Sequence, residues 1–175
     1  SAYLDYGQIG NTSLQQTRFD TTQTLPLING QFSLASTNGI FQTSITKDPL
    51  TGLEQRSVTS NDALMALQMS TGNLSSSQLE NSSQWVAADV DQNGKVQARD
   101  AWLINQYVVG NMVADSRVGT WTFADSSQIP TSLNAGNALL TPESSISTIS
   151  LSSARQNLDI TAILRGDIDG SFVNL

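Results

Sequence analysis

The chain has no cysteine and no histidine among its 175 residues. This absence excludes disulfide bonds, thiolate nucleophiles, Ser-His-Asp catalysis and the usual ligands of zinc. Carboxylate and amide oxygens are the ligands that the chain offers to a metal ion, and they favour calcium or magnesium. An enzyme built on this chain would need a catalytic carboxylate pair. Metal binding explains the clustered carboxylates of the chain better, so we expect a protein without enzymatic activity.

Charged residues are also scarce, at 13% of the chain, and acidic residues outnumber basic ones by 15 to 8, for a formal net charge of −7. A sparse, acidic surface does not bind nucleic acid by neutralising its phosphates. No apolar run approaches the roughly 18–20 residues that cross a membrane, and no signal peptide is visible. The composition therefore predicts no nucleic-acid partner and no membrane span, and it suits a protein that binds cations.

The most informative segment, residues 89–100, reads DVDQNGKVQARD. A twelve-residue calcium-binding loop has oxygen ligands at positions 1, 3 and 5, a backbone carbonyl at position 7, a carboxylate at position 12 and a glycine at position 6 for a sharp turn. The predicted ligands in this segment are Asp89, Asp91, Asn93, the carbonyl of Lys95, and Asp100. The alternative is an empty acidic turn, because Asp, Asn and Gly are also common turn residues.

The loop is followed directly by a predicted helix over residues 101–110, which has a glycine as its C-cap. A shift of the sequence places residues 58–72 on residues 96–110, where a valine, an Asp-Ala pair, a glutamine and the final glycine coincide. The chain therefore contains a duplicated loop-helix unit, and we expect the two copies to fold as a pair around a shared core. The expected core side chains in the two helices include Leu64, Leu67, Met69, Trp102 and Ile104.

The first copy of the loop keeps the closing Asp62 but has Thr51, Leu53 and Gln55 at the positions of the first three ligands. Asp48 is a further candidate ligand, although it lies too far before Asp62 for a loop of twelve residues. The first copy therefore either binds an ion through an insertion or does not bind one by itself.

A third acidic motif, GDIDGS at residues 166–171, has the front half of a calcium loop without a back half. The first repeat has a back half without a front half. We hypothesise that Asp167 and Asp169 pack beside Asp62 and complete a second calcium site. The alternatives are an ordinary acidic turn or a separate weak site.

Two loop-helix repeats with aspartate at position 12 and a helix that opens with Asp-Ala resemble the dockerin type I modules of secreted bacterial proteins. The resembling residues are 58–72 and 89–110. The resemblance extends loosely to the W-x-F element at 121–123 and to the motif at 166–171, as in dockerin-like segments of large bacterial surface proteins. It implies a calcium-dependent, non-enzymatic folding and interaction module located outside the cell or at its surface.

In dockerins, the residues at loop positions 10 and 11 face a cohesin partner. The residues at these positions here are Ala98, Arg99, Ser60 and Asn61. They do not form a hydroxyl pair in both repeats, so the resemblance does not imply a cellulosomal partner. A cohesin-like or an intramolecular protein partner is expected instead.

The remaining segments read as β-structure. Residues 25–34 predict a hairpin with an Asn-Gly turn, and residues 146–151 and 158–164 alternate apolar and polar side chains as half-buried strands do. We therefore expect an α+β fold, in which dockerin-like calcium repeats over 48–112 pack with antiparallel β-structure from segments 1–47 and 113–175. The sequence leaves open whether the β-segments form a separate domain.

Three functional interpretations follow. The first is a calcium-binding structural and interaction module of a secreted bacterial surface or adhesin-type protein. The second is a dockerin that docks a cohesin-type partner in trans. The third is a calcium-dependent self-processing module that cuts the labile bond between Asp48 and Pro49.

Overall fold

The computed structural model describes residues 2–4, 12–18, 21–26, 31–32, 42–47, 54–140 and 158–174. The chain divides into two compact units. Unit 1 contains residues 1–48, 123–128 and 141–162, and unit 2 contains residues 49–122, 129–140 and 163–175. Helices and strands are both present, so the fold is of the α+β class. Residues 113–175, expected as one β-rich extension, contribute to both units.

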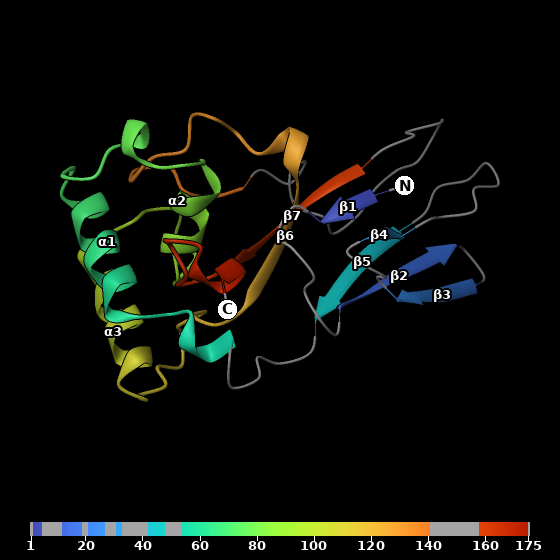
Figure 1. Cartoon of the computed structure of the whole chain (residues 1–175), viewed down its shortest axis with the longest axis horizontal. Coiled ribbons are helices and arrows are strands. Elements are labelled where there is room, and N and C mark those ends of the chain that lie inside the picture. Colours follow the sequence, from blue (N-terminus) through green and yellow to red (C-terminus); the bar gives the residue numbers. More distant parts are fainter. Residues whose placement is uncertain are drawn as a thin grey trace. The chain divides into compact units, whose positions relative to one another are not determined.

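The described strands form two sheets (Figure 1). In the first sheet, β2 (Thr12–Arg18) pairs antiparallel with both β3 (Thr21–Pro26) and β5 (Gln42–Lys47). The second sheet has the order β4-β1-β7-β6. Its strands are β1 (Ala2–Leu4), β4 (Gln31–Phe32), β6 (Trp121–Asp125) and β7 (Leu158–Leu164).

Two expectations about the β-structure are wrong in part. The N-terminal and C-terminal segments do pair, but β1 and β7 run parallel rather than antiparallel. A parallel pair needs a long connection, and the greater part of the chain separates these strands. The hairpin predicted over 25–34 is also wrong, because β3 and β4 lie in different sheets. The Asn-Gly turn signal is local, whereas strand pairing depends on partners elsewhere in the chain. The strand expected at 146–151 lies outside the described residues.

Unit 2 contains the helices α1 (Ser60–Ser70), α2 (Ser83–Ala88) and α3 (Ala98–Val108). Short 3-10 helices lie at Glu54–Arg56 and Ser76–Gln78 in unit 2, at Ser126–Gln128 in unit 1, and at Ser171–Asn174 in unit 2. Helices α1 and α3 pack against each other, as Figure 1 shows. The two predicted helices are therefore confirmed, although α3 begins earlier than expected. Helix α2 was not predicted, because its six residues are too few for a clear periodic pattern.

Each of the two long helices has an aspartate at its third residue, which accepts a hydrogen bond from the backbone amide three residues before it. The N–H of Thr59 donates to Oδ2 of Asp62 at 2.8 Å, and the N–H of Gln97 donates to Oδ2 of Asp100 at 2.9 Å. This arrangement satisfies an amide at the helix start that has no partner within the helix. The same two carboxylates also serve the acidic clusters described below.

The core of unit 2 lies between α1, α2 and α3, and its largest fully buried apolar side chains are Met69, Leu103, Ile104, Leu133, Ile168, Val86 and Val90. The burial predicted for Met69 and Ile104 is confirmed. The prediction was wrong for Leu64, Leu67 and Trp102, which are 52%, 43% and 48% exposed. Packing buries only one stripe of an amphipathic helix, and these three side chains lie outside it. Within the described part of the chain, none of the helices has the length and apolar character of a transmembrane segment.

Candidate metal centres

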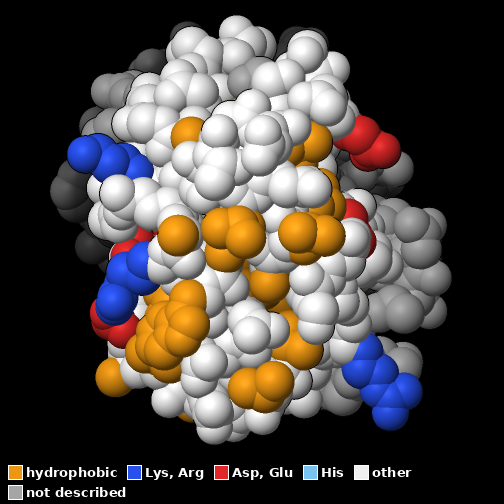
Figure 2. Space-filling view, turned by 90° about the vertical axis from the view of Figure 1, so that its left-hand side faces the viewer, with side chains coloured by type: hydrophobic (Ala, Val, Ile, Leu, Met, Phe, Trp, Pro, Cys, Tyr) orange, Lys and Arg blue, Asp and Glu red, His pale blue; other side chains and the backbone are white. Residues whose placement is uncertain are grey.

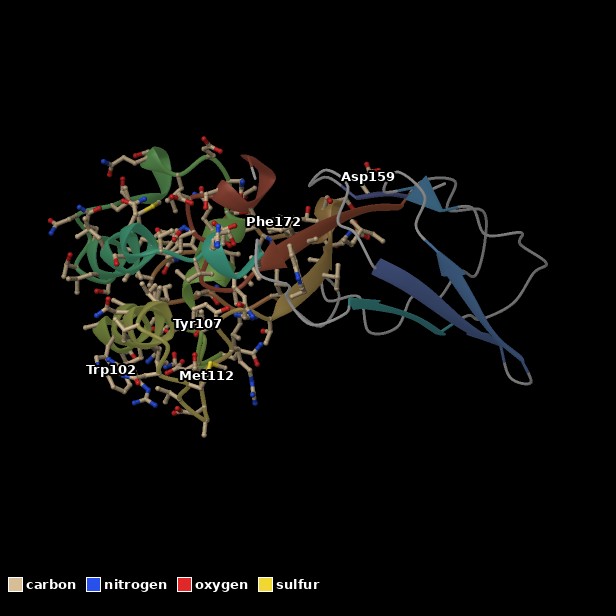
Figure 3. All side chains as sticks on the ribbon, turned by 60° about the horizontal axis from the view of Figure 1, so that its bottom comes forward. Trp102, Tyr107, Met112, Asp159 and Phe172 are labelled. Atoms are coloured by element: carbon tan, nitrogen blue, oxygen red, sulfur yellow. The ribbon has the colours of Figure 1, made fainter. Side chains whose placement is uncertain are left out.

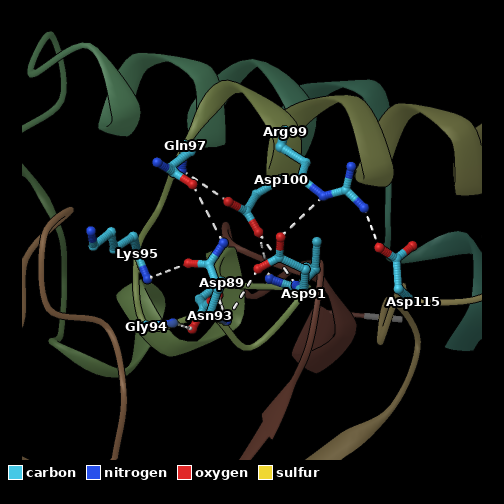
Figure 4. A network of polar contacts seen from close by, with 10 residues as sticks. Asp89, Asp91, Asn93, Gly94, Lys95, Gln97, Arg99, Asp100 and Asp115 are labelled. Atoms are coloured by element: carbon cyan, nitrogen blue, oxygen red, sulfur yellow. Dashed lines mark hydrogen bonds and ion pairs between the residues drawn. The ribbon is translucent and has the colours of Figure 1, made fainter.

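The first acidic cluster, named cluster I, consists of Asp89, Asp91 and Asp100 in the segment from the end of α2 to the start of α3 (Figure 4). One carboxylate oxygen from each residue lies within 4.8 Å of the others. Asp89 and Asp100 are fully buried, and Asp91 is partly exposed. The predicted loop therefore brings its first, third and twelfth residues together.

Backbone amides of the loop itself hold these carboxylates in place. Asp89 accepts hydrogen bonds from the N–H groups of Asn93 at 3.1 Å and Gly94 at 3.0 Å. Asp100 accepts from the N–H groups of Val90 at 3.0 Å and Asp91 at 3.4 Å. The backbone of the loop thus wraps around the two carboxylates, with its N–H groups pointing toward their oxygens.

The predicted ligands at positions 5 and 7 lie beside each other. The N–H of Lys95 donates to Oδ1 of Asn93 at 2.9 Å, while the Lys95 side chain is exposed. The glycine at position 6, Gly94, has a φ of +85°, a conformation that favours glycine. An added Cβ there would lie 2.9 Å from the Leu139 side chain. The sharp turn expected at this position is therefore present.

The second acidic cluster, named cluster II, consists of Asp62, Asp167 and Asp169, whose carboxylate oxygens also lie within 4.8 Å of one another. The N–H groups of Ile168 and Asp169 donate to Oδ1 of Asp62 at 2.7 and 3.1 Å, across 106 and 107 residues of sequence. The expected packing of Asp167 and Asp169 beside Asp62 is what the structure has. Whether the cluster binds an ion stays a prediction.

The C-terminal half of cluster II is a tight turn. Asp167 accepts hydrogen bonds from the N–H groups of Ser171 at 3.0 Å and Phe172 at 3.1 Å, and Asp169 accepts from Ser171 N–H at 3.0 Å. The hydroxyl of Ser171 donates to the backbone carbonyl of Ser57 at 2.9 Å. This last bond ties the turn to the residues just before α1.

The two clusters share one hydrogen-bond pattern. In each, the first aspartate accepts from the amides four and five residues later, and the second accepts from the amide two residues later. In each, the closing aspartate accepts hydrogen bonds from the amides at loop positions 2 and 3, which are those of Val90 and Asp91 in cluster I and of Ile168 and Asp169 in cluster II. The fourth position has positive φ in both, at Gln92 (+60°) and Gly170 (+68°). Cluster II is thus the same loop in two pieces, with its front at 167–171 and its back at 57–62.

This equivalence assigns roles to two residues that the sequence analysis missed. Counting back from the closing aspartate, Ser57 stands at position 7 and matches Lys95, so its buried carbonyl is a candidate ligand. Ser171 stands at position 5 and matches Asn93. Position counting within the two half-loops was the available signal for both residues.

Asp48 and the bond between Asp48 and Pro49 lie outside the described residues. The four residues predicted to face a partner, Ser60, Asn61, Ala98 and Arg99, are exposed in the first turns of α1 and α3. Two of them also reach the clusters. The Nδ2 of Asn61 donates to Asp169 at 3.0 Å, and Nε of Arg99 lies 3.2 Å from Oδ2 of Asp91, while the same guanidinium pairs with Asp115.

Burial dominates the electrostatics of both clusters. Burial, together with the charges of the neighbouring aspartates, raises the pKa of Asp100 to about 6 and that of Asp167 to about 7. The pKa values of Asp62 and Asp89 are raised for the same reason, mainly by burial. Both clusters therefore concentrate negative charge where water does not stabilise it well, and a bound cation would relieve this cost.

Comparisons with protein-family models, curated proteins and solved structures found no match for this chain. The residues themselves therefore carry the functional argument. What they establish directly is two groups of three aspartates, each of which could hold a metal ion.

Proposed function

We propose that this chain is a calcium-binding, non-enzymatic structural and interaction module, in which two calcium ions stabilise the fold of unit 2. The observation that carries the proposal is the repetition of one carboxylate arrangement, once in a continuous loop and once in two distant segments. A solvated acidic turn explains one such arrangement. It does not explain why residues more than 100 positions apart reproduce the same loop.

The chemistry of the ligands favours calcium. Each cluster offers three carboxylates, a neutral side-chain oxygen at position 5 and a backbone carbonyl at position 7. Calcium takes six to eight hard oxygen ligands in flexible geometry, with water completing the shell. Magnesium demands a near-ideal octahedron and usually keeps several waters, so it fits a loop with so many protein oxygens less well.

Ion binding would hold segments of unit 2 together at two places. At cluster I an ion would hold the end of α2 to the start of α3, and at cluster II it would hold the C-terminal turn to the start of α1. If calcium stands at about 100 times its Kd, each site adds roughly 2.7 kcal/mol to stability. This is a large share of the roughly 5–15 kcal/mol that stabilises a typical domain.

The difference in free calcium between the inside and the outside of cells makes such a module suited to a secreted bacterial surface or adhesin-type protein. There, ion binding would link completion of the fold to export. The dockerin type I resemblance supports the same setting.

A second candidate function, docking of a cohesin-type partner in trans, is favoured by the exposed apolar side chains of the helices. Figure 2 faces the side of unit 2 that carries α1 and α3, and hydrophobic side chains gather there. Leu64, Leu67 and Trp102 are each about half exposed, and Met112 is 82% exposed. Trp102 lies on α3, and Met112 follows the end of that helix (Figure 3). Affinity capture of secreted proteins with and without a chelator tests this candidate, which requires a specific partner retained only with calcium.

Calorimetric titration of the whole chain with calcium tests the main proposal. The expected result is two bound ions in the wild type and one in Asp89→Ala. Asp159→Ala, at an exposed residue of β7, is the control and should still bind two ions. A chain that binds no calcium, or an Asp89→Ala variant with unchanged stoichiometry, would refute the assignment.

A further inference from the structure

Arg165 is the only basic residue in the buried set of the described residues, with 5% of its surface exposed. It follows β7 directly and lies two residues before Asp167 of cluster II. Burial lowers the pKa of its guanidinium, while the charges of Asp89 and Asp100 of cluster I raise it. Burying a cation is costly unless the cation is well paired, so the contacts of the guanidinium must offset this cost.

The guanidinium contacts the loop of cluster I. Its Nη1 donates to the carbonyls of Val86 at 2.9 Å and Asp89 at 2.6 Å, and its Nε donates to Oγ1 of Thr122 at 3.0 Å. With the Gln92 amide turned so that its oxygen faces the guanidinium, this oxygen accepts from Nε at 3.1 Å and from Nη2 at 3.2 Å. Arg165 therefore holds position 1 of the loop through a carbonyl and position 4 through a side chain.

The backbone after Arg165 belongs to cluster II. The N–H of Gly166 donates to the carbonyl of Ala87 in α2 at 2.9 Å, and a Cβ added at Gly166 would lie 2.8 Å from Cγ1 of Val118. Helix α2 also reaches the next turn, since Nε2 of Gln84 donates to the carbonyl of Ile168 at 2.6 Å. The turn has little room to shift without moving Arg165 or α2.

We propose that Arg165 is a positioning residue that couples the two clusters, so that a calcium ion in one raises the calcium affinity of the other. The proposal rests on the proposed function, in which both clusters bind calcium. An ion in cluster II fixes the turn at 166–171, which fixes the guanidinium and with it the Asp89 carbonyl and the Gln92 side chain. The first ion thus orders part of the second site, and the second ion binds a site that is already formed.

The sign of the coupling separates this mechanism from simple electrostatics. Two divalent cations repel each other, so charge alone predicts that each ion weakens the binding of the other. Ordering through Arg165 predicts the opposite. Coupling is also reciprocal, because the effect of the first ion on the second equals the effect of the second on the first.

Calorimetric calcium titrations of the whole chain test the coupling. In the wild-type background, Asp167→Asn removes the ion of cluster II and is expected to weaken calcium binding at cluster I by about fivefold or more. In an Arg165→Gln background, the same substitution is expected to change that affinity by less than about twofold. Arg165→Lys keeps the charge but not the planar fork of donors, so it should not restore the coupling.

Since Arg165 is buried, Gln92→Gly provides a variant that is easier to fold. Gln92 is exposed and has positive φ, which glycine adopts readily. It should reduce the coupling, whereas Gln128→Gly, at an exposed residue of unit 1, should not. This inference alone would be overturned if the two clusters bound calcium independently of each other. It would also be overturned if the coupling survived both Arg165→Gln and Gln92→Gly. A chain that binds no calcium would overturn the proposed function with it.

Discussion

Replacement of Asp167 by asparagine is expected to stabilise the calcium-free protein and to destabilise the calcium-loaded one. Asp167 is 8% exposed, and its carboxylate accepts hydrogen bonds from the N–H groups of Ser171 and Phe172. Burial, together with the charges of Asp62 and Asp169, raises its pKa from 3.8 to about 7. The substitution changes this charge with almost no change in volume.

The raised pKa of Asp167 sets the direction of the stability change in the calcium-free protein. Because the pKa in the folded state lies above that of the unfolded chain, the folded state favours the protonated acid, and stability is lost as the pH rises through about 7. At about pH 8, the ionised carboxylate costs on the order of 4 kcal/mol, at 1.36 kcal/mol for each pKa unit. Asparagine removes this cost but turns an amide toward the N–H of Phe172, which costs about 1–3 kcal/mol. Without calcium, the variant should therefore be more stable by about 1–3 kcal/mol.

With calcium bound, we expect the wild type to be more stable than the Asp167→Asn variant. At about 1,000 times Kd, each occupied site adds roughly 4.1 kcal/mol, and the variant forgoes the contribution of cluster II. Urea unfolding at pH 8, followed by circular dichroism with chelator and with excess calcium, measures both differences. Asp159→Asn, an exposed aspartate, is the control and should change neither. If Asp167→Asn destabilises the protein equally in both conditions, the carboxylate serves only the hydrogen bonds of the turn, and the reasoning is refuted.

Three further predictions use single measurements. Gly166→Ala should destabilise unit 2 by more than the roughly 1–2 kcal/mol of a positive φ alone, because its Cβ meets Val118, whereas Gly72→Ala, with φ +74° and open space, should cost only that amount in thermal unfolding. Calcium affinity should fall on acidification through about pH 6, the pKa of Asp100, with proton uptake or release measured in buffers of different ionisation heat. In urea unfolding, Leu103→Ala should cost about 2–5 kcal/mol, and the half-exposed Trp102→Ala under about 1 kcal/mol.

The loop of cluster I could be predicted from the sequence because all its interactions are local. Its candidate ligands lie within twelve residues, and the amides that hold Asp89 and Asp100 belong to the same loop. The capping interactions that begin α1 and α3 are local for the same reason. The half-loops of cluster II could be paired by their complementary positions, which allowed Asp62 to be placed beside Asp167 before the fold was known.

The sequence could not predict the contacts of residues whose partners are far away along the chain. Arg165 gives no signal in the sequence, because a lone arginine after an apolar strand does not reveal that it contacts the carbonyl of Asp89. The exposure of Leu64 and Trp102 also depends on how α1 and α3 pack, since both residues are apolar and have helical spacing.

The sequence by itself determined which side chains could bind a metal ion, the absence of histidine and cysteine centres, the continuous acidic loop of cluster I and the two long helices. Each of these depends on residue types or on neighbours within a few turns of chain. The tertiary structure decided the parallel pairing of β1 with β7, the separation of β3 from β4, and the contact of Arg165 with the loop of cluster I. These features need segments far apart in sequence to meet, and their free energy comes from shared burial that no local pattern encodes.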